Sequence, residues 1–309
     1  MKDQKPSVGV VMITYGHEKY IQEAIEGVLM QEVDFPVRLI VADDCSPDGT
    51  EALVRNIIAT HPKGHWIDYM RHDTNKGMMP NFTFALQRAT EKYIALCDGD
   101  DYWTDSLKLQ KQVDFLEQNE ECVLTHSSFM KRFKDDSLCE VDFELKEVQN
   151  REEIIKNTLV KTCTVLFRNH LLSKQEISHL FNFKIGDLPL FLFLANYGKF
   201  HYKNQIDTVY RVNVGHNAME NIQNDLSFVF YDVYARMYDF SDDNRVKYLY
   251  LLNILSNLRS LILAKKENLP NKGVKYILYR IKQVRHNSIS IFSPVEILFL
   301  MKLFKKRIV

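Results

Sequence analysis

A cluster of carboxylates stands out at residues 96–103, which read LCDGDDYW. Asp98, Asp100 and Asp101 follow the apolar run YIALC, so three negative charges gather where a buried strand is expected to end. Hard oxygen ligands of this kind suit Mg²⁺ or Mn²⁺, which usually keep several waters and are shared with a diphosphate. The cluster predicts a divalent-cation site, and a solvated acidic turn before a helix near Asp105 is the alternative.

A second acidic pair follows another apolar run. Asp43 and Asp44 end the segment VRLIVADD, where a carboxylate can either cap the next helix or accept a hydrogen bond from a nucleobase or ribose. Tyr15 follows the first apolar run and could stack on a base or belong to the core. The turn at 75–77, Asn-Lys-Gly, could bring backbone and one cation toward a phosphate, or be an ordinary turn.

The elements that must carry these residues alternate between strand and helix patterns. Strands are predicted at 7–14, 37–44, 65–72 and 93–97, and helices at 17–31, after the turn SPDGT, and around 82–89. This alternation predicts an α/β fold of Rossmann-like type, with a mostly parallel sheet covered by helices on both faces. In such sheets ligands bind beyond the carboxyl ends of the strands, where all of these polar clusters lie.

The rest of the chain divides near residue 220. A helix is predicted after Trp103, strands at 122–130 and 161–168, and a loop or irregular hairpin at 131–150. Beyond residue 220 the pattern is helical, at 225–265 and 272–285. We therefore predict an α/β domain at 1–220 and a helical C-terminal region at 221–309.

Composition excludes several classes of partner and site. Among the 309 residues, 40 basic and 40 acidic side chains cancel, so no overall field favours nucleic acid. Five cysteines without a CxxC pair argue against a zinc site or a disulfide framework and favour a reducing cytoplasm. The start of the chain is interpreted as a strand rather than a signal peptide, and no apolar run reaches the roughly 20 residues of a membrane span.

The last segment, SPVEILFLMKLFKKRIV at 293–309, has two interpretations. Its apolar residues could form a terminal helix packed on the body of the protein. Its lysines and arginine could instead meet anionic headgroups while the apolar side enters the membrane surface. The sequence leaves both open, so peripheral contact with the inner face of the cell membrane stays an expectation.

Four motifs together carry a resemblance to a known family. VVMITYGHEKYIQEAIEGVLMQ, LIVADDCSPDGT, NKGMMPNFTFAL and YIALCDGDDYW, in this order and spacing, resemble the N-terminal half of the family 2 glycosyltransferases. The resemblance covers about the first 125 residues. It implies a GT-A fold, a nucleotide-sugar donor, Mn²⁺ or Mg²⁺ as cofactor, and inverting transfer of the kind used in bacterial polysaccharide and cell-envelope biosynthesis.

The resemblance also implies roles for particular residues. Those expected to hold the nucleotide sugar are Thr14, Tyr15, Asp44, Asn75, Asn81 and Asp98. Asp98 and Asp100 match the Asp-x-Asp motif that binds ribose and metal, and Asp101 extends it as a further metal ligand. Arg211 or His216 is expected to approach the diphosphate, and each has a plain surface role as the alternative.

An inverting transfer also needs a general base on the side opposite the leaving group. The segment FKIGDLPLFLFLANYG offers Asp187 at the start of a helix, after Gly186 and with Pro189 in the first turn. Asp187 could be only a helix cap, or it could both cap and act as the base. Family members similar to this sequence have a Glu-Asp or Gly-Asp pair here, which implies that Asp187 is the base.

The sequence therefore predicts a metal-dependent inverting glycosyltransferase. The donor is expected to be a UDP-sugar, and the acceptor a hydroxyl of a saccharide or lipid-linked saccharide. One rival is a phosphotransferase with Asp98 as nucleophile, but its loop would follow the first strand, without Tyr102 two places beyond the second aspartate. The other rival is a non-catalytic nucleotide-sugar-binding module, which would not need Asp187.

Overall fold

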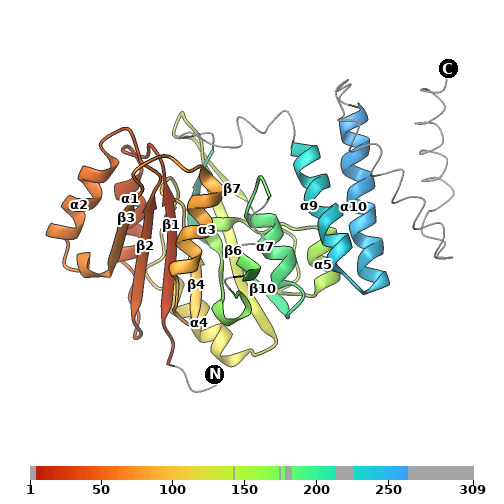
Figure 1. The fold of residues 1–309 in the computed structure, drawn as a ribbon. Helices are drawn as coiled ribbons and strands as arrows, with labels where there is room; N and C mark the ends of the chain where they lie inside the picture. The colour runs from red at the N-terminus through yellow and green to blue at the C-terminus, as the bar shows by residue number, and fades with distance from the viewer. Residues whose placement is uncertain are drawn as a thin grey trace.

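The computed structural model describes residues 5–141, 143–173, 175–177, 183–212, 214 and 226–263. Its strands join into one sheet with the order β3-β2-β1-β4-β9-β6-β10-β5, and β7 and β8 pair with β6 and β10 (Figure 1). The strands are β1 Val8–Thr14, β2 Val37–Asp43, β3 Ile67–Arg71, β4 Tyr93–Leu96, β5 Tyr102–Trp103, β6 Cys122–Arg132, β7 Leu138–Val141, β8 Val148–Gln149, β9 Leu166–Arg168 and β10 Lys199–Arg211. The helices are α1 Ile21–Leu29, α2 Thr50–Thr60, α3 Met78–Arg88, α4 Lys108–Gln118, α5 Arg151–Lys156, α7 Asp187–Leu194, α9 Leu226–Phe240 and α10 Asn244–Leu263.

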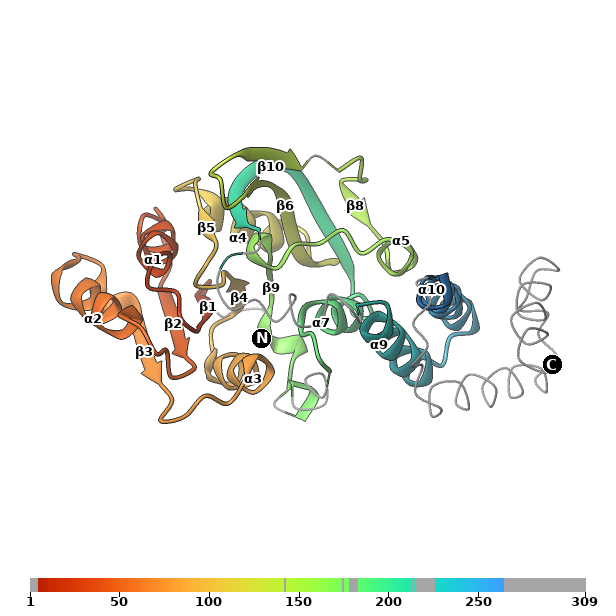
Figure 2. The ribbon, with the colours of Figure 1, turned by 90° about the horizontal axis from the view of Figure 1, so that it is seen from above.

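The first four strands of this order are parallel, as the sequence pattern predicts. Along β1, Val8, Val10 and Met12 enter one core and Val11 enters another, because successive side chains of a strand point to opposite faces. Helices α1, α2 and α4 share the first core, and α3 and α7 share the second. Figure 2 shows α1 and α3 on opposite sides of the sheet. Helices thus cover both faces of the sheet.

The second half of the sheet is mixed. β9 runs antiparallel to β4 and β6, β10 runs parallel to β6, and β5 is antiparallel to β10. The strand predicted at 122–130 extends to Arg132, and β7 pairs back on it as an antiparallel hairpin. This confirms the hairpin alternative for part of 131–150. β10 ends at Arg211, beside the loop that carries the three aspartates.

The helical region beyond the sheet shares a third core with α5 and α7. The stretch predicted to be helical at 225–265 contains two helices, α9 and α10, separated at residues 241–243. No helix among the described residues is long and apolar enough to cross a membrane. The boundary near residue 220, His216, the helix predicted at 272–285 and the segment 293–309 lie outside the described residues.

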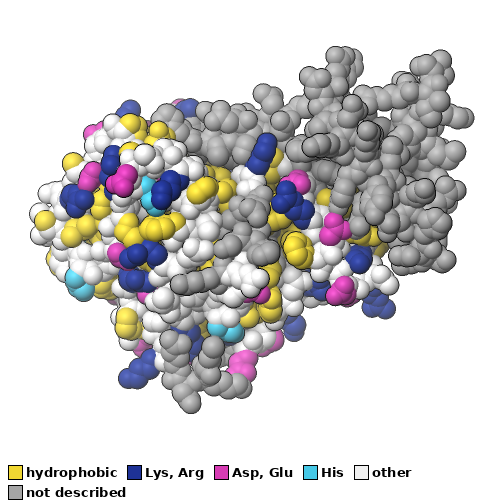
Figure 3. Space-filling view, in the orientation of Figure 1, with side chains coloured by type: hydrophobic (Ala, Val, Ile, Leu, Met, Phe, Trp, Pro, Cys, Tyr) yellow, Lys and Arg dark blue, Asp and Glu magenta, His cyan; other side chains and the backbone are white. Residues whose placement is uncertain are grey.

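The visible surface carries mixed charges. On the face seen in Figure 3, basic and acidic side chains of the described residues are interspersed rather than separated by sign. This distribution agrees with the equal numbers of basic and acidic residues in the sequence.

A buried ion pair joins α4 to β10. The ammonium of Lys108, whose side chain is 0% exposed, lies 3.1 Å from Asp207 Oδ1 and donates to the carbonyl of Thr164. Asp207 also accepts hydrogen bonds from the hydroxyls of Ser127 and Thr208. The pair joins α4, β6, β10 and the 3₁₀ turn at Thr162–Thr164. A buried pair with its remaining hydrogen bonds satisfied is costly to break from one side.

Replacing Lys108 with methionine should therefore lower the free energy of unfolding by about 3 kcal/mol, because Asp207 would be left buried and unpaired. Urea unfolding followed by circular dichroism measures this change. Lys111→Met is the matched control, since Lys111 pairs with Asp105 at the partly exposed surface. The control should lose less than about 1 kcal/mol, and equal losses in the two variants would contradict the account.

Candidate functional site

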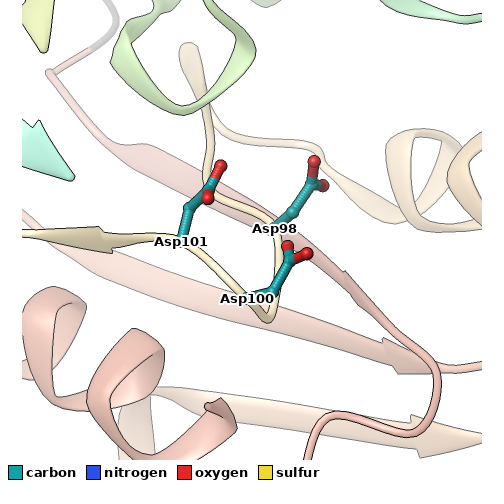
Figure 4. Close-up of side chains that lie close together, drawn as sticks. All are labelled: Asp98, Asp100 and Asp101. Carbon is teal, nitrogen blue, oxygen red and sulfur yellow. The ribbon is translucent and has the colours of Figure 1, made fainter. Parts of the chain in front are cut away.

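The three aspartates of the acidic loop form one cluster at the end of β4. A carboxylate oxygen from each of Asp98, Asp100 and Asp101 lies within 4.8 Å of the others. Figure 4 shows the three side chains rising to the same side of one short turn. The three carboxylates therefore converge, with Asp100 and Asp101 buried, in an arrangement that could hold a metal ion.

The glycine of the Asp-Gly-Asp sequence lets this loop lie against the end of β1. The Gly99 amide donates to the carbonyl of Ile13 at 3.0 Å. A Cβ on Gly99 would lie 2.8 Å from Thr14 Oγ1 and 3.0 Å from His17 Nδ1, closer than such atoms approach. Any larger residue at this position would therefore force Thr14 or His17 to shift.

Arg211 holds the loop from the side of β10. Its backbone amide donates to Asp101 Oδ1 at 2.9 Å, and its guanidinium donates to the carbonyl of Asp100 at 2.6 Å. The guanidinium also pairs with Glu23 and lies between the rings of Tyr20 and Tyr102. Arg211 thus fixes the acidic loop in this structure, and its approach to a diphosphate stays a prediction.

Two aspartates of the cluster, Asp98 and Asp101, hold a proton more tightly than an ordinary aspartate does. Burial and the charge of Asp100 raise the pKa of Asp98 to about 7, although Lys161 opposes the shift. Burial, Asp100 and Asp98 raise the pKa of Asp101 well above its usual value, against the opposing effects of Lys161 and the Arg211 amide. Mutual repulsion in a desolvated site explains both directions.

These residues fit a divalent cation. Converging carboxylates supply the hard oxygen ligands that Mg²⁺ and Mn²⁺ prefer. A dication would also relieve the repulsion that raises the pKa of Asp98 and Asp101. Asp98 and Asp100 are the residues that would hold it, with Asp101 beside them.

The affinity for Mn²⁺ should consequently depend on pH. Below about pH 7 the metal-free site holds a proton on Asp98, so a cation must displace it. We expect the affinity to rise with pH up to about 7, by up to about tenfold per pH unit, and then to level off. Isothermal titration of Mn²⁺ at several pH values measures this dependence, and an affinity independent of pH would contradict the assignment.

The raised pKa of Asp98 also affects the stability of the metal-free fold, which decreases as pH rises, whereas the Mn²⁺ affinity increases. A carboxyl whose folded pKa is raised binds its proton more tightly in the folded protein than in the unfolded chain. In the metal-free protein this group therefore lowers stability as pH rises from its ordinary value of 3.8 to about 7. Thermal unfolding with a chelator should show this loss, and added Mn²⁺ should reverse it above about pH 7.

Asp43 and Asp44 accept hydrogen bonds from different segments of the chain. Asp43 is fully buried and accepts hydrogen bonds from the Tyr69 hydroxyl at 2.7 Å and the Ser46 amide at 2.7 Å. Asp44 accepts from the amides of Lys76 and Gly77 at 2.7 and 2.8 Å. Asp44 thus ties the loop after β2 to the turn before α3, the two segments expected to meet a nucleotide.

The other predicted nucleotide-binding residues surround this junction. Thr14 is buried at the end of β1, and its Oγ1 has no hydrogen-bond partner among the described residues. Tyr15 is partly buried next to it. Asn75 accepts from the Gly77 amide, within the turn that Asp44 holds. Asn81 is buried, joined to His72 and to the carbonyl of Ala42, so in this structure its side chain links α3 to β2.

Asp187 lies near the acidic cluster although it is far away in sequence. It is the first residue of α7, and its Oδ1 accepts from the Leu188 amide. Burial and the charge of Asp100 raise the pKa of Asp98 most. The charge of Asp187 raises it further, so Asp187 interacts electrostatically with Asp98. Gly186 makes this placement possible, because a Cβ there would lie 2.9–3.0 Å from side-chain atoms of Phe82 and Met79 on α3.

Sequence reasoning missed Lys161 and Tyr210. The Lys161 ammonium lies 3.3 Å from the centre of the Tyr210 ring. Its charge lowers the pKa of Asp98 and Asp101, and Asp187 in turn raises the pKa of Lys161. One signal could have revealed it, since Lys161 interrupts the apolar stretch LVKTCTVLF just where a strand was expected to begin.

Comparison with known proteins identifies a family and relatives. The family model described as glycosyl transferase family 2 matches residues 9–173, over half of the chain. An uncharacterized protein of Mycobacterium tuberculosis, Rv1520, is 42% identical over 114 residues, which are 37% of this chain and 32% of that protein. The chain thus aligns with about a third of that relative's length. WfaP of Escherichia coli, named a UDP-Glc:alpha-D-GlcNAc-diphosphoundecaprenol beta-1,3-glucosyltransferase, is 26% identical over 67% of this chain and 78% of its own length.

Solved structures share the fold. TarS 1–349 of S. aureus in complex with UDP-GlcNAc superposes with a TM-score of 0.63 at 19% identity, covering 83% of this chain and 73% of TarS 1–349. The mannosyltransferase PcManGT of Pyrobaculum calidifontis, in complex with GDP-Man and Mn²⁺, gives a TM-score of 0.57 at 16% identity. That match covers 91% of this chain and 81% of PcManGT. These likenesses confirm the predicted GT-A fold, a mostly parallel sheet flanked by helices.

Proposed function

The chain belongs to glycosyl transferase family 2, and from that premise we propose that it transfers a sugar from a nucleotide-sugar donor to a hydroxyl group, with inversion at the anomeric carbon. The observation that carries this proposal is the meeting of two separate acidic elements. The acidic loop after β4 and Asp187 at the start of α7 interact electrostatically, although almost ninety positions separate them in the sequence. The acidic loop is suited to a metal ion beside the leaving diphosphate, and Asp187 is suited to accept a proton from the attacking hydroxyl.

The proposed chemistry assigns a separate task to each element. A Mn²⁺ or Mg²⁺ held by Asp98 and Asp100 would supply positive charge against the leaving diphosphate. The Asp187 carboxylate accepts the proton of the acceptor hydroxyl. The hydroxyl oxygen bonds to the anomeric carbon as the bond from that carbon to the diphosphate breaks. Arg211 and Gly99 keep the acidic loop in place during this displacement.

The nucleotide is proposed to lie over the ends of β1 and β2. Thr14, Tyr15 and Asp44 border this region, and Asn75 and Asn81 belong to the turn and helix behind it. The unpartnered hydroxyl of Thr14 supports a role in ligand binding, because a buried polar group without a partner is costly. Asp101 and Arg211 are proposed to act beside the metal and the diphosphate.

The relatives' names support a UDP-sugar as donor and a saccharide or lipid-linked saccharide as acceptor. WfaP is named for a UDP-glucose donor and a diphosphoundecaprenol-linked acceptor, and TarS was solved with UDP-GlcNAc. We propose a hexosyl transfer in cell-envelope polysaccharide biosynthesis, on the cytoplasmic side of the membrane. Residues 1–220 would form the catalytic domain, and 221–309 a helical region suited to peripheral contact with the membrane.

A screen of nucleotide sugars in the presence of Mn²⁺ tests this function. Thermal shift and release of nucleoside diphosphate are read together, with a lipid-linked saccharide as acceptor. We expect at least one UDP-sugar to stabilise the protein and to be consumed only when acceptor and metal are both present. Binding without release under every condition would favour the non-catalytic module and overturn the proposal.

A further inference from the structure

Lys161 is a positive charge embedded among the site's carboxylates. Its ammonium lies 3.3 Å from the centre of the Tyr210 ring. The next residue along β10 is Arg211, whose amide donates to Asp101. Asp98, Asp101 and Asp187 all interact with Lys161 electrostatically. The lysine thus lies against the β10 residue next to the one that holds Asp101, and its charge reaches both the acidic loop and Asp187.

The backbone beside this lysine is held firmly. The Lys161 carbonyl accepts from both the amide and the hydroxyl of Thr164. The next carbonyls are also bound, since Trp103 Nε1 donates to Cys163, and Lys108 Nζ and Gln112 Nε2 donate to Thr164. An anchored backbone and an aromatic face below the ammonium restrict where this charge can go.

We propose that Lys161 is a positioning residue, a fixed counter-charge that balances the acidic loop, links it to Asp187 and limits how tightly the site holds a divalent cation. The inference rests on the proposed function for its role in turnover, but not for its effect on metal binding. The sequence analysis predicted no residue as a counter-charge for the acidic loop.

The charge state of Lys161 agrees with this role. Burial alone would lower its pKa, but Tyr210, Cys163, Asp101 and Asp187 outweigh burial, so the pKa of Lys161 is raised. The lysine therefore stays protonated wherever the acidic loop can bind a metal. A fixed positive charge that interacts with the carboxylates of the acidic loop weakens the binding of a dication there through ordinary Coulomb repulsion.

Manganese binding to the purified full chain, without any nucleotide, tests the inference. Free Mn²⁺ is measured by electron paramagnetic resonance during titration of wild type, Lys161→Met, Lys161→Arg and the control Lys156→Met. Lys156 lies on α5 with a side chain 58% exposed, so its replacement changes the net charge equally but at the surface. We expect Lys161→Met to bind Mn²⁺ about tenfold more tightly than wild type, and the other two variants to match wild type.

A double-mutant cycle tests the link to Asp187 with no metal present. In a chelator, Lys161→Met and Asp187→Asn should each lower the midpoint of urea unfolding, and the double variant should lower it by less than their sum.

Three results would overturn the inference: unchanged or weaker Mn²⁺ binding in Lys161→Met, no Mn²⁺ binding in wild type, or additive shifts in the cycle. Tighter Mn²⁺ binding and non-additive shifts in a protein that transfers no sugar would support the inference and refute only the proposed function.

Discussion

Replacing Asp187 with asparagine is expected to lower kcat about a thousandfold while leaving metal-dependent binding of the nucleotide within about twofold of wild type. The amide keeps the shape of the side chain and can still accept from the Leu188 amide, but it cannot take a proton. Single-turnover transfer measures the rate, and calorimetry with UDP and Mn²⁺ measures the binding. The separation of the two readouts is the essential result, because a merely structural aspartate would affect both.

Asp243→Asn is the matched control for this experiment. Asp243 precedes α10, and its Oδ1 accepts from the Arg245 amide, so it is an aspartate near a helix start that belongs to the C-terminal helices. The control should transfer sugar at the normal rate. Normal turnover by Asp187→Asn would show that another group accepts the proton.

Replacing Asp100 with asparagine should weaken Mn²⁺ binding about a hundredfold or more and reduce transfer at least as much. One carboxylate of the converging three would be lost, while the carbonyl of residue 100 still accepts from Arg211. Mn²⁺ titration and transfer at a fixed metal concentration measure the two effects. Excess metal should recover part of the activity, because the defect lies in binding the cation.

Asp105→Asn controls for the loss of one negative charge near the loop. Asp105 pairs with Lys111 and Gln205 outside the cluster. Its replacement should leave Mn²⁺ binding within about twofold of wild type, since partly exposed charges outside the site are screened. Equal losses in Asp100→Asn and Asp105→Asn would indicate a diffuse charge effect in place of a metal site.

Much of the sheet could be predicted from the sequence because its signals are local. The alternation of Val8, Val10 and Met12 with Val11 along β1 marks a strand between two covered faces, and the structure confirms it. The acidic loop and the Asp43–Asp44 pair follow buried strands, so their positions come from the general topology of parallel sheets. The start of α7 at Asp187 was also predicted, from Gly186 and Pro189.

The contacts between distant segments could not be predicted in this way. Lys161 interacts electrostatically with Asp101 and Asp187 because β10 runs beside β6 and places the Tyr210 ring against the ammonium, an arrangement with no local sequence pattern. The partners of Asn81, which are the His72 ring and the carbonyl of Ala42, likewise come from other segments of the chain. Such partners depend on tertiary packing, which a single sequence does not specify residue by residue.

The central claim is that the aspartates after β4 hold a dication against the donor's diphosphate. Pulsed electron paramagnetic resonance of Mn²⁺ bound with UDP tests it directly, by detecting hyperfine coupling between the manganese and the phosphorus nuclei. The account predicts this coupling in wild type and in Asp187→Asn, and its loss in Asp100→Asn. Phosphorus coupling that persists unchanged in Asp100→Asn, or is absent from wild type with both ligands bound, would contradict it.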